Sequence, residues 1–339
     1  MAGVRRKRIS RSAPNPAGAL APVLCAAIAL AACGASAPNT GATTSGLPGP
    51  PCGADTVATV AGAIGTVATR IYEEEAAGGP DKRQVERDRP LLSALAAGNR
   101  PAVKSAVTRL VFSGTHIVRL RIIQGGEVLA DVGGPYVLAP VRGVLRSGGR
   151  TVGEYVLSVQ DDVGYVKLAK RFIGLPLIFM RGSARVPLPG TLGSSPPIPE
   201  HGDVSWEGSD YRVLSVHAEA FPSGALRISL LVPVPSPSAS RSCAAVRLLE
   251  LGRLAKRIWK RFIKIGAAPS SYARSTPGLT GLQIFVRRGS RPVSGSLGAG
   301  PAHIPDEGTV EYEGITYGVT SFPGRVGSWH VRVYVLLAA

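Results

Sequence analysis

The chain has 339 residues, of which 45% are hydrophobic, so it is long enough to bury a core in one or two domains. Its 39 Lys and Arg residues outnumber its 22 Asp and Glu residues, which gives a formal net charge of +17. A basic exterior of this kind suits acidic polymers or anionic lipid. Nucleic acid is not expected as a partner, because the sequence shows no helix-turn-helix, zinc-finger or RNA-binding signature and begins with an export signal.

Residues 1–32 indicate that export signal. Five basic residues precede position 12, and residues 17–32 are apolar and uncharged. This run is shorter and richer in alanine than a membrane-spanning helix, which needs about 20 strongly apolar residues. Its last residues, Leu30-Ala31-Ala32-Cys33, resemble the lipobox of bacterial lipoproteins. The resemblance implies cleavage before Cys33 and acylation of its thiol; the alternative is an ordinary secretory signal with an incidental cysteine.

Residues 33–51 predict a flexible tether between the acylated cysteine and the folded part of the chain. After Cys33 the segment is uncharged and consists mainly of Gly, Ala, Ser, Thr, Pro and Asn, so it cannot bury a core. Two acyl chains suffice for stable anchoring. The expected location is therefore the outer face of the cell membrane, with the protein held there by lipid.

The cysteines suggest one disulfide. Cys25 is removed with the signal and Cys33 is the lipid site, which leaves Cys52 and Cys243, each at the start of a predicted helix. In an oxidising compartment we expect these two to pair, although two unpaired thiols remain the alternative because sequence does not establish proximity. No spacing of Cys and His is typical of a metal site, so neither a metal nor another cofactor is expected.

Helices are predicted first along the folded part. Residues 52–75 carry small apolar residues at helical spacing, and Gly78-Gly79-Pro80 ends that helix. Residues 84–112 predict further helix, with breaks near Pro90 and at 98–101.

Strands follow. Residues 116–132 predict a hairpin with a Gly-Gly turn, in which Arg119 and Arg121 alternate with apolar residues and are expected on a solvated face. Residues 151–160 predict another strand. Asp161 and Asp162 are then placed to cap a helix that runs to about residue 173.

An internal repeat is the most specific feature of the folded part. Ile198-Pro199-Glu200-His201-Gly202 matches Ile304-Pro305-Asp306-Glu307-Gly308 at an offset of 106 (304 − 198), and the strand at 178–181 recurs at 284–287. We therefore expect a larger module at 52–235 and a smaller related module at 243–339, with strands at 116–160 that the second lacks.

The pairing of helices between the two copies stays open. Leu168-Ala169-Lys170-Arg171 is identical to Leu254-Ala255-Lys256-Arg257, whereas Arg70-Ile71-Tyr72 resembles Arg257-Ile258-Trp259.

This order of elements resembles the double Cache family of extracytoplasmic, PAS-like sensors. The resemblance is carried by the hairpin at 119–131, by residues 153–162, where a strand runs into a helix, and by the strand and turn at 177–182. It implies an α+β fold of two related PAS/Cache-like antiparallel-sheet modules behind a long N-terminal helix. It also implies a small-molecule pocket between the concave face of a sheet and the loops over it.

The resemblance suggests site residues as well. Members that bind amino acids use a Tyr, an Arg, a Trp-Tyr pair, a further Tyr and an Asp. Here Tyr136, Arg142 and Tyr155 stand in comparable order, the Trp is missing, and the acid position falls on Gln160 with Asp161 next. An anionic, carboxylate-bearing ligand held by Arg142 or Arg146 is the expectation, because a guanidinium forks onto a carboxylate. The alternatives are a capping role for Asp161 and sheet packing for the two tyrosines.

One predicted helix has a second interpretation. Residues 246–265 place apolar side chains on one stripe, and the basic residues Arg253, Lys256, Arg257, Lys260, Arg261 and Lys264 lie largely off it. That face is either simply solvated or in contact with anionic headgroups or wall polymers.

The sequence predicts a lipid-anchored, extracytoplasmic small-molecule-binding protein of the sensor type. It has no output domain of its own and is expected to act through a membrane signalling partner. It shows no GxSxG, HExxH or Walker motif, so an enzyme is not expected. The alternative is a structural or adhesive envelope lipoprotein whose basic surface binds anionic polymer or lipid.

Overall fold

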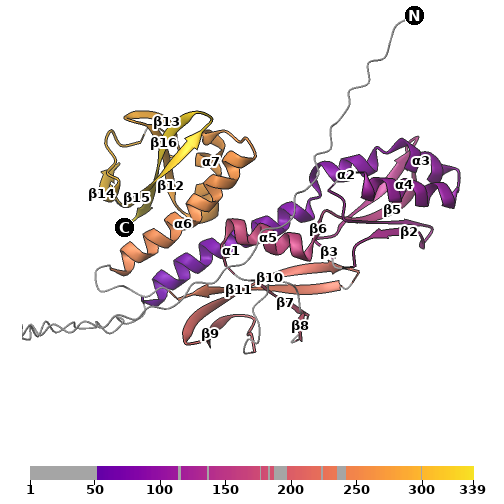
Figure 1. Ribbon diagram of the computed structural model, residues 1–339, viewed down its shortest axis with the longest axis horizontal. Coiled ribbons are helices and arrows are strands. Elements are labelled where there is room, and N and C mark those ends of the chain that lie inside the picture. Colours follow the sequence, from indigo (N-terminus) through magenta and orange to yellow (C-terminus); the bar gives the residue numbers. More distant parts are fainter. Residues whose placement is uncertain are drawn as a thin grey trace, which may run out of the picture. The chain divides into compact units, whose positions relative to one another are not determined.

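The computed structural model describes residues 52–113, 116–135, 137–175, 177–181, 184–186, 197–222, 224–234, 242–298 and 300–339. The predicted signal, Cys33, the tether and Tyr136 lie outside these residues. The described part is built from helices and antiparallel sheets, as the predicted α+β class requires (Figure 1).

Two of the three sheets have the same topology. The first-repeat sheet contains the order β8-β7-β11-β10-β9, and the second-repeat sheet has the order β13-β12-β16-β15-β14. The corresponding strands are β7 (Leu177–Arg181), β8 (Ala184–Val186), β9 (Gly202–Trp206), β10 (Ser209–Phe221) and β11 (Gly224–Pro233) in the first, and β12 (Gln283–Arg288), β13 (Arg291–Gly295), β14 (Glu307–Tyr312), β15 (Ile315–Val326) and β16 (Trp329–Ala338) in the second. The sequence repeat is thus also a repeat of structure.

Backbone conformation repeats in the hairpins that join β9 to β10 and β14 to β15. Each has a two-residue Glu-Gly turn, in which Glu207 and Glu313 have φ of 49° and 52°. A positive φ is uncommon for a residue other than glycine, and turns of this kind match the twist of the flanking strands. The same unusual conformation at positions 106 apart is independent evidence of duplication.

The helices complete the repeat and decide how the two copies align. In each copy a long helix is followed by a short helix and then by the sheet: α1 (Ala54–Ala76) and α5 (Asp162–Phe172) in the first, α6 (Cys243–Lys264) and α7 (Pro269–Thr280) in the second. Helix α1 therefore corresponds to α6, at an offset of 187. The identical tetrapeptides at 168 and 254 lie on α5 and α6, which are not equivalent helices.

Packing of the long helices on their sheets supports this alignment. A Cβ on Gly65 of α1 would lie 3.5 Å from Leu214 of β10, and one on Gly252 of α6 would lie 2.8 Å from Thr320 of β15. The two glycines are 187 residues apart and their strand neighbours are 106 residues apart. These are the offsets at which the long helices and the sheets of the two repeats align. At Gly252 the absence of a Cβ lets β15 approach α6 closely, whereas at Gly65 the distance is an ordinary van der Waals contact.

The first repeat carries a large insert between its two helices. The insert has three helices, α2 (Gly79–Glu86), α3 (Arg89–Ala96) and α4 (Arg100–Phe112), and an insert sheet of order β2-β1-β5-β4. Its strands are β1 (Arg119–Gln124), β2 (Glu127–Gly133), β4 (Val141–Ser147) and β5 (Arg150–Ser158), whereas the short β3 (Val137–Leu138) and β6 (Gln160–Asp161) join the first-repeat sheet.

The range 52–235, expected as one module, therefore holds two sheets. The insert has a separate hydrophobic core, which includes Leu91, Leu110, Leu120 and Leu157. Its own helices bury the apolar face of the insert sheet, so it needs no other sheet to cover it. At the equivalent place the second repeat has only residues 265–268 between α6 and α7.

The two repeats share one core. A single cluster of buried side chains draws on α1, α5, α6 and α7 and on both repeat sheets, with Ala68 and Ala255 at equivalent positions of the long helices. The apolar faces of the four helices are thus buried together with both sheets. The repeats form one packed body rather than two independent modules.

Arg119 and Arg121 do not lie on a solvated face as expected. Both guanidiniums bind the carboxylate of Asp131, and they lie 4.9 and 4.5 Å from the ring centre of Phe221 on β10. Burial by itself raises the pKa of Asp131, but the hydrogen bonds from the two arginines outweigh it and lower the pKa. These alternating arginines connect the insert sheet to the first-repeat sheet through ion pairs and cation–π contacts.

Cys52 and Cys243 lie together at the start of the two long helices. Their Cα atoms are 5.4 Å apart, and the structure joins the sulfur atoms as a disulfide. Because α1 and α6 are equivalent helices, the bond links corresponding ends of the two repeats.

Candidate functional site

The residues predicted to bind a ligand do not line a common pocket in the described part of the chain. Arg142 on β4 forms an ion pair with Glu219 on β10, with one Nη1–Oε2 distance of 2.9 Å. Tyr155 on β5 is buried in the insert core, and its hydroxyl donates to Glu86 at 2.8 Å. Burial and, next, this hydrogen bond raise the pKa of Tyr155. Tyr155 is a packed core aromatic, and the guanidinium of Arg142 already has a carboxylate partner.

The remaining predicted residues do not complete a pocket either. Arg146 is exposed on β4, and Gln160 lies on β6. Asp161 is the N-cap of α5, where its carboxylate accepts a hydrogen bond from the Gly164 amide at 2.5 Å. None of these residues lines the cavities described next.

The largest of those cavities lies between the four helices of the two repeats and is called the bundle cavity here. Its volume is about 510 Å³, and every one of α1, α5, α6 and α7 contributes to its lining. Apolar side chains form most of the wall: Val67, Ile71, Leu168, Phe172, Ile258, Phe262 and Leu279. A cavity of this size and lining is typical of sites for small organic ligands.

Charged groups stand on this apolar background. Arg70 and Glu74 line the cavity but form an ion pair with each other, with Nε and Oε1 3.2 Å apart. Glu75 and Arg261 also line it, and within the described residues neither forms an ion pair. The guanidinium of Arg261 lies 6.0 Å from the ring centre of Phe172.

Glu75 has an altered acidity. Its side chain is half-buried, and this burial, followed by the neighbouring charge of Glu74, raises its pKa, while Arg261 acts in the opposite direction. A carboxylate with a raised pKa in a cavity is a candidate for ligand binding, because a cation brought by a ligand would offset the cost of burying its charge.

Sequence reasoning missed this site because it belongs to neither repeat alone. Once α1 is aligned with α6, equivalent positions face the same cavity: Ile71 with Ile258, and Glu74 with Arg261. The available signal was the run Glu73-Glu74-Glu75 at the end of a helix whose counterpart carries Lys260 and Arg261 at the first two of those positions.

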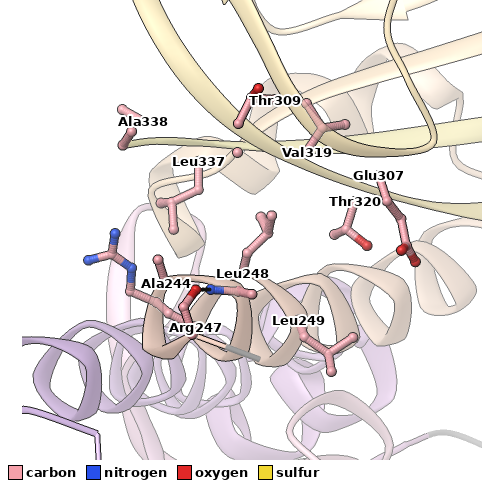
Figure 2. A pocket seen from close by; sticks show the side chains of 15 residues that line it. Ala244, Arg247, Leu248, Leu249, Glu307, Thr309, Val319, Thr320, Leu337 and Ala338 are labelled. Atoms are coloured by element: carbon pink, nitrogen blue, oxygen red, sulfur yellow. Dashed lines mark hydrogen bonds between the residues drawn. The ribbon is translucent and has the colours of Figure 1, made fainter. Parts of the chain in front are cut away.

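Two further cavities are smaller than the bundle cavity. One, of about 350 Å³, lies between the first turns of α6 and the second-repeat sheet, and Figure 2 shows Leu248 and Leu337 pointing into it. Its charged lining residues are Arg247 and Glu307. The other, of about 410 Å³, lies between α1, α6 and β11 and contains Arg253 paired with Glu250. The second has no carboxylate without an ion-pair partner among the described residues. The first does combine such a carboxylate, Glu307, with a guanidinium, Arg247, but its volume is smaller than that of the bundle cavity.

The described residues contain neither a metal-binding cluster nor a membrane-spanning helix. No group of three or more His, Cys, Asp or Glu side chains is arranged to hold a metal ion there. None of the helices in that part is long and apolar enough to cross a bilayer.

Comparison with known proteins gives distant structural matches only. No protein-family model and no curated protein matches the chain. The ligand-binding domain of the Pseudomonas fluorescens chemoreceptor CtaA, in complex with L-alanine, matches at 10% identity and a TM-score of 0.29 over 49% of this chain and 93% of its own. The periplasmic domain of Vibrio cholerae LuxQ matches at 8% identity and a TM-score of 0.15 over 84% of this chain and 99% of its own.

Proposed function

We propose that the chain is a lipid-anchored extracytoplasmic protein that binds a small amphipathic molecule in the bundle cavity. The observation that carries this proposal is the half-buried carboxylate of Glu75, which has a raised pKa and no ion-pair partner among the described residues, on an apolar wall. A buried charge without a partner is costly, and a cationic ligand supplies the partner.

The chemistry of the cavity favours an amine with an apolar body. The ammonium group binds Glu75, and the body packs on Ile71, Ile258 and Phe262. A ligand that also carries a carboxylate places it against Arg261, so an apolar amino acid or a related zwitterion uses both charges. We place the ligand in this cavity rather than around Arg142, where the sequence led us to expect an anionic ligand.

A ligand there contacts both repeats at once. Ile71 and Phe172 belong to the first repeat, and Ile258 and Phe262 belong to the second. Binding therefore favours one arrangement of the four helices over others, which is what a sensor requires in order to act on a partner protein.

A thermal-shift screen tests this proposal. Apolar amino acids, alkyl amines and organic acids are compared on the full chain, and we expect the amino acids and amines to raise the melting temperature, because only they offer a cation to Glu75. Organic acids that shift it while every amine fails would contradict the assignment.

The affinity for such a ligand should depend on pH through Glu75. Its pKa is raised in the folded protein, and only the ionised carboxylate attracts an ammonium group. The affinity should therefore rise as pH rises through that pKa and then level off, and the Glu75→Gln variant should show no such rise. An unchanged pH profile in the variant would assign the dependence to another group.

The anchor is tested separately. The Cys33→Ser variant lacks the thiol that the lipobox resemblance makes the acyl acceptor, so we expect it to lose the mass of the acyl groups. Mass spectrometry of the wild-type N-terminus tests the proposed acylation directly. An unmodified Cys33, or an uncleaved signal, would contradict the lipid anchor and would leave the proposal about the bundle cavity unaffected.

A further inference from the structure

The charge of α5 and α6 differs sharply from that of their equivalent helices in the other repeat. Helices α5 and α6 together hold ten Lys and Arg residues, three and seven, and two carboxylates, one in each helix. Their counterparts α7 and α1 hold two Lys and Arg residues, one in each, and four carboxylates, all in α1. The net charge is thus +8 (10 − 2) for one pair of helices and −2 (2 − 4) for the other.

Six exposed cations of the adjoining helices α5 and α6 are together called the basic ridge here. It consists of Lys167, Arg171, Arg253, Arg257, Lys260 and Lys264, all of them exposed. On α6 the residues 253, 257, 260 and 264 follow one another at helical spacing. The two helices meet where Arg257 lies against Gly174, just after α5, and where Arg261 faces Phe172.

Most of this charge has no partner within the protein. Arg253 is paired with Glu250, whereas Lys167, Arg171, Lys260 and Lys264 form no ion pair within the described residues. Neighbouring like charges repel one another. An anionic surface outside the protein would offset this repulsion.

The duplication supplies an internal comparison. Because α1 and α6 are equivalent, Glu73 and Glu74 stand where α6 has Lys260 and Arg261. Both helices pack on their sheets in the same way, so the fold itself does not require basic residues at these positions. Basic residues at these positions of the long helix are therefore a feature of the second repeat, and they call for a separate explanation.

We propose that the basic ridge rests on the surface of an anionic bilayer. A row of cations on two adjoining helices matches a plane of anionic headgroups, each cation adding to the attraction. The chain between Cys33 and Cys52 has 18 residues, 34–51, and spans at most about 60 Å when extended. A domain held by a lipid at Cys33 is therefore within reach of that surface, and the ridge fixes which side faces it.

The test compares two variants of equal charge, both in the full chain with Cys33→Ser, so that acylation does not contribute. The ridge variant carries Lys167→Gln, Arg171→Gln, Lys260→Gln and Lys264→Gln. The control variant carries Arg87→Gln, Lys104→Gln, Arg291→Gln and Arg325→Gln, four exposed cations on other elements. The probe is vesicles of phosphatidylglycerol and phosphatidylcholine, and binding is measured by co-sedimentation at low and high salt.

We expect the ridge variant to bind the anionic vesicles about 100- to 1000-fold more weakly than the unsubstituted chain, and the control to change by less than about 10-fold. Raising the salt concentration should weaken the unsubstituted chain and the control far more than the ridge variant. Equal losses in the two variants would reduce the effect to net charge and overturn the proposal. Tighter binding of the unsubstituted chain to soluble polyglutamate than to the vesicles would overturn it in favour of a polymer. Circular dichroism of both variants shows that the loss does not come from unfolding.

Discussion

Replacement of Cys52 by serine should lower the free energy of unfolding by about 2–5 kcal/mol. The disulfide with Cys243 closes a loop between residues 191 apart in sequence, so it removes much of the freedom of the unfolded chain. It also ties together the starts of α1 and α6, which otherwise are held by the shared core. Urea unfolding of the two proteins, followed by circular dichroism, measures the difference.

Three controls accompany this experiment. Cys243→Ser should cost as much as Cys52→Ser, and the double variant should cost no more than either, because all three lack the same bond. Reduction of the unsubstituted protein should lower its stability to the same level. Alkylation of both thiols in the native protein without prior reduction would show that they are not bonded and would contradict the prediction.

The Tyr272→Ala substitution should lower the free energy of unfolding by about 3–5 kcal/mol, as the removal of other large aromatic side chains from a core does. Tyr272 on α7 is fully buried in the cluster that both repeats share, and its ring centre lies 5.0 Å from that of Trp259 on α6. Its hydroxyl donates to the Ala255 carbonyl at 2.9 Å, and the substitution leaves that oxygen without this partner. Thermal unfolding followed by circular dichroism measures the loss.

The number of thermal unfolding transitions is as informative as their midpoint temperatures. Since one core joins the repeats, the variant should still unfold in a single step, with the whole transition moved to lower temperature. Trp329→Ala is the comparison, because Trp329 is 50% exposed and should cost less than about 1 kcal/mol. Two separate transitions, of which Tyr272→Ala moves only one, would mean that the repeats are independent.

The sequence was a good guide wherever a pattern was local. The Gly-Gly turn of the hairpin, the capping position of Asp161 and the offset of 106 between the sheets all have their counterparts in the structure. Turns and caps depend on residues close together in sequence, and duplicated strands keep their spacing. These features can be predicted because few distant contacts decide them.

Helix equivalence and side-chain surroundings were harder to predict. A match of four residues between α5 and α6 was misleading because amphipathic helices repeat similar apolar and basic residues. Arg119 and Arg121 alternate like solvent-facing residues, yet Asp131 and Phe221 bury them. Only the arrangement of distant elements determines such contacts.

The candidate site depended most on arrangement. The tyrosines and arginines named by resemblance come from one stretch of the chain, whereas the bundle cavity takes side chains from four helices that the insert and the first-repeat sheet separate in sequence. Neither Glu75 nor Arg261 belongs to a motif. Their presence in one cavity follows from the way the two repeats pack, which short sequence patterns do not encode.

Isothermal titration of the best amine or amino acid from the screen is the most direct test of binding in the bundle cavity. The unsubstituted chain is compared with Glu75→Gln and with Glu73→Gln, which removes an exposed carboxylate two positions away. Loss of a charge-assisted contact at Glu75 should weaken binding about 10- to 100-fold, and the Glu73 variant should bind as the unsubstituted chain does. Equal affinity in all three proteins would contradict the assignment of the ligand to this cavity.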